Sequence, residues 1–191
     1  MRWDRFFEDL EDQLDSEWEA ERAALDTEAE RLRLSRLTLR ERLASIGPAR
    51  PVLDLTDGTA VSGEVTGVGA DWAALSHADG AVLVPFWAIA GVGLAHADLL
   101  RTARPVALGR LSERMTFGYA LRDLARRRVT VRLRVAGREY AGTLDRAAAD
   151  HVDLAVHDVS EPRRARAITG YRMLAMPAIT SVSALGSATA T

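Results

Sequence analysis

The chain has 191 residues, 48% of them hydrophobic and 27% charged, with a formal net charge of −2 and no cysteine. The lack of cysteine excludes disulfides, thiolate nucleophiles and thiolate metal sites. No apolar run reaches the roughly 20 residues that a membrane-spanning helix needs, and the first ten residues have no signal-peptide core. We therefore expect a soluble, cytoplasmic protein without membrane insertion.

The charges are distributed unevenly along the chain. Residues 1–30 carry 12 acidic side chains and 3 arginines, and residues 51–98 carry 6 acidic side chains and no arginine. Residues 99–191 carry 16 arginines and 8 acidic side chains. Only this last half has the charge to present a basic face to a polyanion.

The first 37 residues predict a long, acidic, amphipathic helix. Residues 2–36 contain neither Gly nor Pro, and the helix-favouring residues Ala, Glu, Leu and Arg dominate. Large apolar side chains recur at the three-, four- and seven-residue spacings of a coiled-coil seam: Trp3, Phe7, Leu10, Leu14, Trp18 and Leu25. The seam has two candidate occupants, the protein's own following domain or a second copy of the chain, which would make a homo-oligomer.

A single pattern then occurs twice. Gly58 precedes Gly63 by five residues, as Gly137 precedes Gly142, and an aspartate follows the second glycine of each pair by eight residues. Residues 129–135 alternate apolar and polar side chains with the period of a strand. Both copies end in Ile-x-x-Val, at Ile89 and at Ile179.

These features predict an α+β fold, a long N-terminal helix followed by two tandem helix-plus-five-stranded small β-barrels. A glycine inside the second strand permits the sharp bend that such a barrel needs. The predicted domains are the helix (1–37), a first barrel with a short leading helix (38–98), a second, basic barrel with a leading helix at 110–127 (99–184), and a disordered tail (185–191).

The order of helix, Leu-x-x-Gly-x(4)-Gly-x-hydrophobic, Asp-led third strand and final Ile-x-x-Val resembles the Sm-like fold, a kind of SH3-like barrel. Eukaryotic Sm and LSm proteins and the bacterial host-factor RNA chaperones have this fold. The family's uridine site needs an Asn near the end of the third strand, where this chain has Ala74 and Asp153. It also needs an Arg-Gly in the following turn, where this chain has Pro85-Phe86 and Ala175-Met176. The resemblance therefore implies the barrel and not its RNA site.

No motif indicates an enzyme, a metal site or a cofactor. The four histidines lack metal-ligand spacing, and Gly-x-Ser-x-Gly is absent. His151 and Asp153 share one strand face, an arrangement more typical of an exposed strand end than of a catalytic pair. We interpret Asp54, Asp57 and Asp71 as surface carboxylates.

Arginines cluster in the second half, and aromatic residues lie close by in the sequence. Such clusters suit a phosphate backbone, and the alternatives are a solvated helix end or pairing with the acidic N-terminal segment. The candidate nucleic-acid-binding residues are Arg126, Arg127, Arg128, Arg132, Arg163, Arg164 and Arg166.

Phe86 and Trp87 are adjacent on a predicted strand, so their side chains point to opposite faces. One of them is expected either at the junction between the two barrels or on a partner surface.

The sequence favours a non-enzymatic protein-interaction or assembly module whose partner is another protein or a second copy of the chain. The alternative is a regulator that binds RNA or DNA through the arginine-rich second barrel. A small-molecule sensor in the cleft between the barrels has no polar constellation in the sequence to support it.

Overall fold

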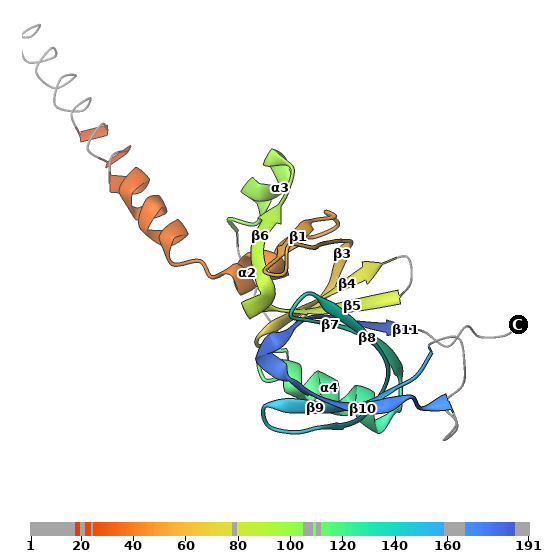
Figure 1. The fold of residues 1–191 in the computed structure, drawn as a ribbon. Helices are drawn as coiled ribbons and strands as arrows, with labels where there is room; N and C mark the ends of the chain where they lie inside the picture. Colours follow the sequence, from red (N-terminus) through yellow and green to blue (C-terminus); the bar gives the residue numbers. More distant parts are fainter. Residues whose placement is uncertain are drawn as a thin grey trace, which may run out of the picture. The chain divides into compact units, whose positions relative to one another are not determined.

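The computed structural model describes residues 18–19, 22–23, 25–77, 80–104, 109, 112–158 and 167–185 (Figure 1). The chain divides into two compact units, Met1–Thr38 and Leu39–Thr191. In the first unit the helical conformation runs through residues 25–35 and ends in a turn at Arg36. Within the described part of the chain, no helix is long and apolar enough to cross a membrane.

The second unit begins with the first copy of the repeat. We call residues 52–93 the first repeat, whose bent second strand is divided into β2 and β3. The elements in this part of the chain are α2 (Leu39–Ala44), β1 (Val52–Leu55), β2 (Ala60–Ser62), β3 (Glu64–Val68), β4 (Trp72–His77), β5 (Gly80–Pro85), the 3-10 turn η1 (Phe86–Ala88), β6 (Ile89–Gly93) and α3 (His96–Arg101).

We call residues 130–185 the second repeat, which has the same order of strands with the bent strand intact. Its elements, with the helix before them, are α4 (Phe117–Arg126), β7 (Thr130–Val135), β8 (Arg138–Ala147), β9 (His151–Val156), β10 (Gly170–Ala175), η3 (Met176–Ala178) and β11 (Ile179–Leu185). The helix starts at Phe117 and not at residue 110, because the Thr116 side chain accepts a hydrogen bond from Tyr119 N and caps it.

The predicted fold class is wrong. The described chain is mostly β, with eleven strands in two antiparallel sheets, and it is not a long helix followed by two separate helix-plus-barrel units. One sheet has the order β2-β1-β6, and the other has the order β10-β9-β8-β7-β11-β5-β4-β3. The physical reason is the pairing of β5 with β11, which merges strands of both repeats into one eight-stranded sheet.

The prediction of a long helix over residues 1–37 is also wrong as a description of the fold. Residues 1–17 lie outside the described part of the chain, and the continuous helical run that is described covers residues 25–35. The predicted tail at 185–191 begins on the last residue of β11, and residues 186–191 lie outside the described residues.

A glycine marks the bend of the second strand in both repeats. A Cβ atom at Gly63 would overlap the carbonyl oxygen of Ser76, and one at Gly142 would overlap that of Ala155. Only glycine lets the neighbouring strand approach this closely. This requirement explains the glycine spacing that first reveals the repeat.

Two hydrophobic cores share the β4–β5 hairpin as a wall. Ala73 and Leu75 pack in the core of the first repeat, together with Leu43 of α2. Trp72 and Ala74, on the other face of the same strand, pack in the core of the second repeat. Burial on both faces explains why β4 is apolar at four consecutive positions and does not alternate.

Candidate functional site

The two repeats join edge to edge through β5 and β11. Their antiparallel register places Leu83 opposite Val182 and continues to Gly80 opposite Leu185. Leu83 packs against the core of the second repeat, to which Val182 belongs. The junction therefore combines backbone strand pairing with burial of an apolar side chain, the two sources of affinity in strand addition.

A turn of the first repeat holds the start of α4. Asp71 Oδ1 accepts a hydrogen bond from Phe117 N at 2.6 Å, and Trp72 Nε1 donates to Met115 O at 2.9 Å. The Asp71 carboxylate therefore satisfies one of the free N–H groups at the N-terminus of the helix, where a negative charge is also favourable. Asp71 is not the simple surface carboxylate that the sequence suggested.

Trp87 lies at the same junction. Its ring makes an edge-to-face contact with Phe117, with centroids 5.3 Å apart, and its Nε1 donates to Ile179 O at 3.2 Å. The neighbouring Phe86 packs against the first core instead. Trp87 therefore lies at the junction between the two repeats, although 42% of its surface is exposed.

The matching turn of the second repeat, around Asp150, caps no helix N-terminus in the described structure, although Gly118 and Arg122 of α4 line a pocket with it. Its backbone is equivalent, since Met176 N donates to Asp150 O at 2.8 Å as Phe86 N donates to Asp71 O at 2.8 Å. The Asp150 side chain is 84% exposed and bonds His151 Nδ1 at 2.7 Å. This hydrogen bond and the neighbouring imidazole lower the pKa of Asp150.

A polar cleft of about 230 Å³ opens between the repeats on one face of the β7–β11–β5 sheet. Arg132 and Arg134 of β7 line it beside Ser183 and Ser181 of β11. Arg134 pairs across the strands with Ser181 and Arg132 with Ser183, so the four side chains form two neighbouring cross-strand pairs. No local sequence pattern predicts that these four residues meet, because the two arginines and the two serines lie about 50 residues apart in the chain.

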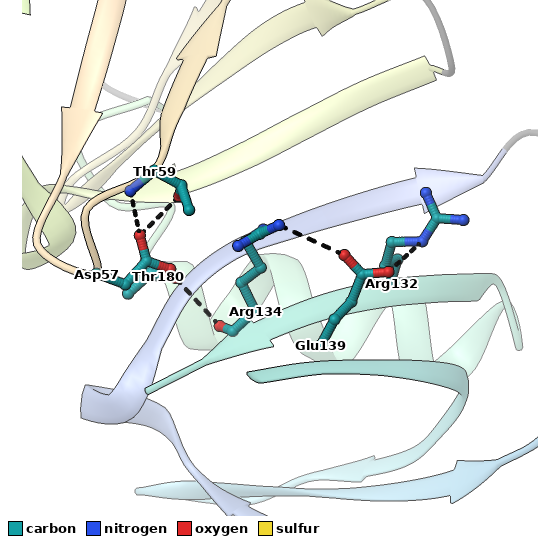
Figure 2. Close-up of polar contacts among 6 residues, drawn as sticks. All are labelled: Asp57, Thr59, Arg132, Arg134, Glu139 and Thr180. Carbon is teal, nitrogen blue, oxygen red and sulfur yellow. Dashed lines mark hydrogen bonds and ion pairs between the residues drawn. The ribbon is translucent and has the colours of Figure 1, made fainter. Parts of the chain in front are cut away.

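Figure 2 shows how Glu139 lies with the two arginines. One carboxylate oxygen is 3.0 Å from Arg132 Nε, and the other is 3.7 Å from Arg134 Nη2. The second distance is too long for a hydrogen bond. Two guanidinium groups thus share one carboxylate.

Asp57 links the first repeat to β11 near this cleft (Figure 2). It accepts hydrogen bonds from Thr59 N at 3.0 Å and from Thr180 Oγ1 at 2.7 Å. Desolvation raises the pKa of Asp57, but the hydrogen bonds from Thr59 and Thr180, together with the charge of Arg134, outweigh it and leave the pKa below its ordinary value. The carboxylate is therefore held ionised as an acceptor between the repeats.

The structure does not bring the predicted nucleic-acid-binding arginines together as free cations. Arg126 and Arg127 both pair with Asp123, and Arg128 lies 3.4 Å from Asp145. Arg132 pairs with Glu139. The remaining three predicted residues, Arg163, Arg164 and Arg166, lie outside the described residues.

The predicted self-association residues Trp3, Phe7, Leu10 and Leu14 also lie outside the described residues. Trp18 and Leu25 are described, and both are exposed, at 63% and 65%.

The histidines form no metal or catalytic cluster among the described residues. His151 bonds the neighbouring Asp150. His157 is buried and lies 2.8 Å from Thr143 Oγ1 and 2.7 Å from Asp158 O. The described residues contain no group of three or more side chains suited to hold a metal ion.

No family model, curated protein or solved structure matches this chain.

Proposed function

We propose that the protein is a non-enzymatic assembly module that joins copies of itself by adding strands at the edges of its sheets. The β5–β11 junction inside the chain is the observation that carries this proposal. There, the fourth strand of one repeat pairs with the last strand of the next. A second chain offers the same two kinds of strand, β10 and β6, and both lie at sheet edges.

The side chains at the β10 edge support a second copy as the occupant. Met173 lies three residues before η3, as Leu83 lies three residues before η1. Leu83 packs on the neighbouring core, whereas Met173 is 74% exposed. An unbranched, flexible apolar side chain in this position suits a partner surface.

The β6 side of the first repeat offers a matching apolar surface. A pocket of about 100 Å³ lies beside β6, lined mainly by apolar side chains that include Leu39, Val92 and Leu94. Val92 lies three residues after Ile89, as Val182 lies three residues after Ile179, so Val92 corresponds to the residue that faces Leu83. We therefore expect Met173 of one copy to face Val92 of another.

The joint between copies is expected to be weaker than the internal one. Where the first repeat presents Trp72 and Ala74 to the next core, the second repeat presents His151 and Asp153. These polar groups lose hydration on association, which costs free energy unless they are paired. The assembly is therefore expected to form and dissociate with protein concentration.

The test is the mass of the full-length protein by light scattering over a range of concentrations. The wild type is expected to exceed the 20.8 kDa of one chain as its concentration rises. Met173→Lys places a charge on the edge and should keep the protein monomeric. Tyr119→Lys is the matched control, because Tyr119 is also exposed, at 56%, but lies on α4. A wild type that stays monomeric throughout, or equal dissociation in both variants, would refute the proposal.

A further inference from the structure

The cleft between the repeats carries more hydrogen-bond donors than the chain itself uses. Arg132 and Arg134 lie two residues apart on β7, so both guanidinium groups extend from the same face of the sheet. Each guanidinium has five N–H donors. Among the described residues, the acceptor between them is the single carboxylate of Glu139.

The formal charges around the two arginines balance when the cleft is empty. Glu139 balances one of the two guanidinium groups. Asp57 balances the other through its charge, but its two oxygens accept their hydrogen bonds from Thr59 and Thr180 and leave the N–H donors of Arg134 to the cleft. His77 of the first repeat also lines the cleft.

The first repeat shows that the fold does not require these polar side chains. In that repeat Asp54 pairs with Gly91 and Val52 with Gly93, across β1 and β6. Counted from the isoleucine that opens each last strand, Gly91 and Gly93 correspond to Ser181 and Ser183. At these four positions, where the first strand pairs with the last, the first repeat has Val, Asp and two glycines. The second repeat has two arginines and two serines there.

These four side chains suit a tetrahedral dianion. Guanidinium groups recognise phosphate through paired, charge-assisted hydrogen bonds, and the serine hydroxyls add two neutral donors. A cleft of about 230 Å³ has room for a phosphate that carries a small organic group. From these observations we infer that the cleft between the repeats binds the phosphate of a small phosphomonoester, at Arg132, Arg134, Ser181 and Ser183.

Glu139 has a defined role in this inference. Its carboxylate occupies the position of an acceptor between the two guanidinium groups when the cleft is empty (Figure 2). Because Glu139 is about half exposed and is the second residue of β8, close to the turn of the β7–β8 hairpin, its side chain can turn away into solvent. The bound phosphate then takes over both arginines.

The binding test uses calorimetric titration of the full-length protein at low ionic strength, with inorganic phosphate and ribose 5-phosphate as probes. The wild type is expected to bind ribose 5-phosphate, and Arg134→Gln to weaken that binding by about tenfold or more, since a charge-assisted hydrogen bond contributes about 1.5–3 kcal/mol. Arg138→Gln is the control: Arg138 is exposed on β8 but does not line the cleft, so its affinity should match the wild type. Thermal unfolding of each variant checks that it is folded.

The two probes separate the sources of the phosphate. Tighter binding of ribose 5-phosphate than of inorganic phosphate supports a monoester site, whereas equal affinity would assign the cleft to the free ion and overturn the organic part of the inference. No heat from either probe at concentrations on the order of 10 mM, which corresponds to about −3 kcal/mol, would overturn the inference as a whole. A single-stranded RNA that binds with equal loss in Arg134→Gln and Arg138→Gln would show diffuse attraction to the basic surface instead.

A second variant tests the role of Glu139. Glu139→Gln removes the competing charge while keeping the shape, so it should tighten ribose 5-phosphate binding severalfold. Weaker binding in this variant would show that Glu139 positions the arginines, and the displacement step would then be wrong.

Discussion

Asp71 and Asp150 occupy the same position in the two repeats, yet their side chains have different partners. Asp71 caps the N-terminus of α4 through Phe117 N, and Asp150, largely exposed, bonds the adjacent His151. The same turn is thus a structural joint in one repeat and an accessible surface in the other.

This difference predicts unequal effects of removing each carboxylate. Asp71→Ala should lower the free energy of unfolding by about 1–2 kcal/mol, the usual cost of losing a helix-capping side chain. Asp150→Ala, the matched control, should leave unfolding unchanged because its carboxylate is exposed. Urea denaturation followed by circular dichroism measures both, and equal losses would contradict the assigned roles.

Phe117 is fully buried where α4, Trp87 and the second core meet. Phe117→Ala should therefore cost about 3–5 kcal/mol of unfolding free energy, as expected for removing a buried aromatic ring. Tyr119→Ala, on the exposed side of the same helix, should change it by less than about 0.5 kcal/mol. A small effect at Phe117 would show that the junction does not depend on this ring.

The bend glycines should resist substitution more than glycines in open positions. Gly63→Ala and Gly142→Ala each force a Cβ into a backbone carbonyl of the neighbouring strand. We expect strong destabilisation or failure to fold. Gly170→Ala is the control, since nothing lies within 4 Å of its added Cβ. Soluble yield and thermal unfolding report the outcome, and a stable Gly63→Ala protein would refute the close approach.

Asp57 predicts a loss of stability in acid. Its folded pKa lies below its ordinary value, so ionised Asp57 stabilises the fold above the unfolded pKa of about 4, and this stability is lost as the pH falls through the folded pKa. Thr180→Val removes one hydrogen bond to Asp57 and should therefore destabilise the protein at pH 7 more than at pH 3. Chemical denaturation at the two pH values tests this, and a pH-independent difference would contradict it.

Removal of residues 1–36 separates two modes of self-association. Residues 39–191 form a compact unit of their own and contain both β6 and β10. The shortened chain should therefore still associate with concentration if the strand edges form the joint. If light scattering finds only monomer, the association belongs to the apolar seam of the N-terminal segment.

Much of the local structure follows from the sequence. The alternation at 129–135 appears as β7, and the spaced glycines mark the bent strands. These signals are short-range, since they arise from backbone sterics and from one buried face. The predicted fold class is wrong because β5 pairs with β11, which lies about 100 residues further along the chain. No local sequence pattern predicts such a long-range pairing.

The candidate site was harder to predict for the same reason. The alternation of β7 predicts that Arg132 and Arg134 face outward from the strand. Ser181 and Ser183 are recognised as part of the site only when β11 is seen to pair with β7. Asp71 looks like any surface carboxylate until α4 begins next to it. The run of apolar residues in β4 was the one available sign that this strand is covered on both faces.

Because one face of β4 and β5 packs in the core of the second repeat, that repeat cannot complete its core from its own strands alone. A chain cut between Arg104 and Gly109 would yield two halves, each with a large apolar surface left open to water. Each half alone should be poorly soluble, whereas co-expression should restore a folded heterodimer through β5 and β11. The two halves could then serve as a split-protein reporter that reassembles through the pairing of β5 with β11.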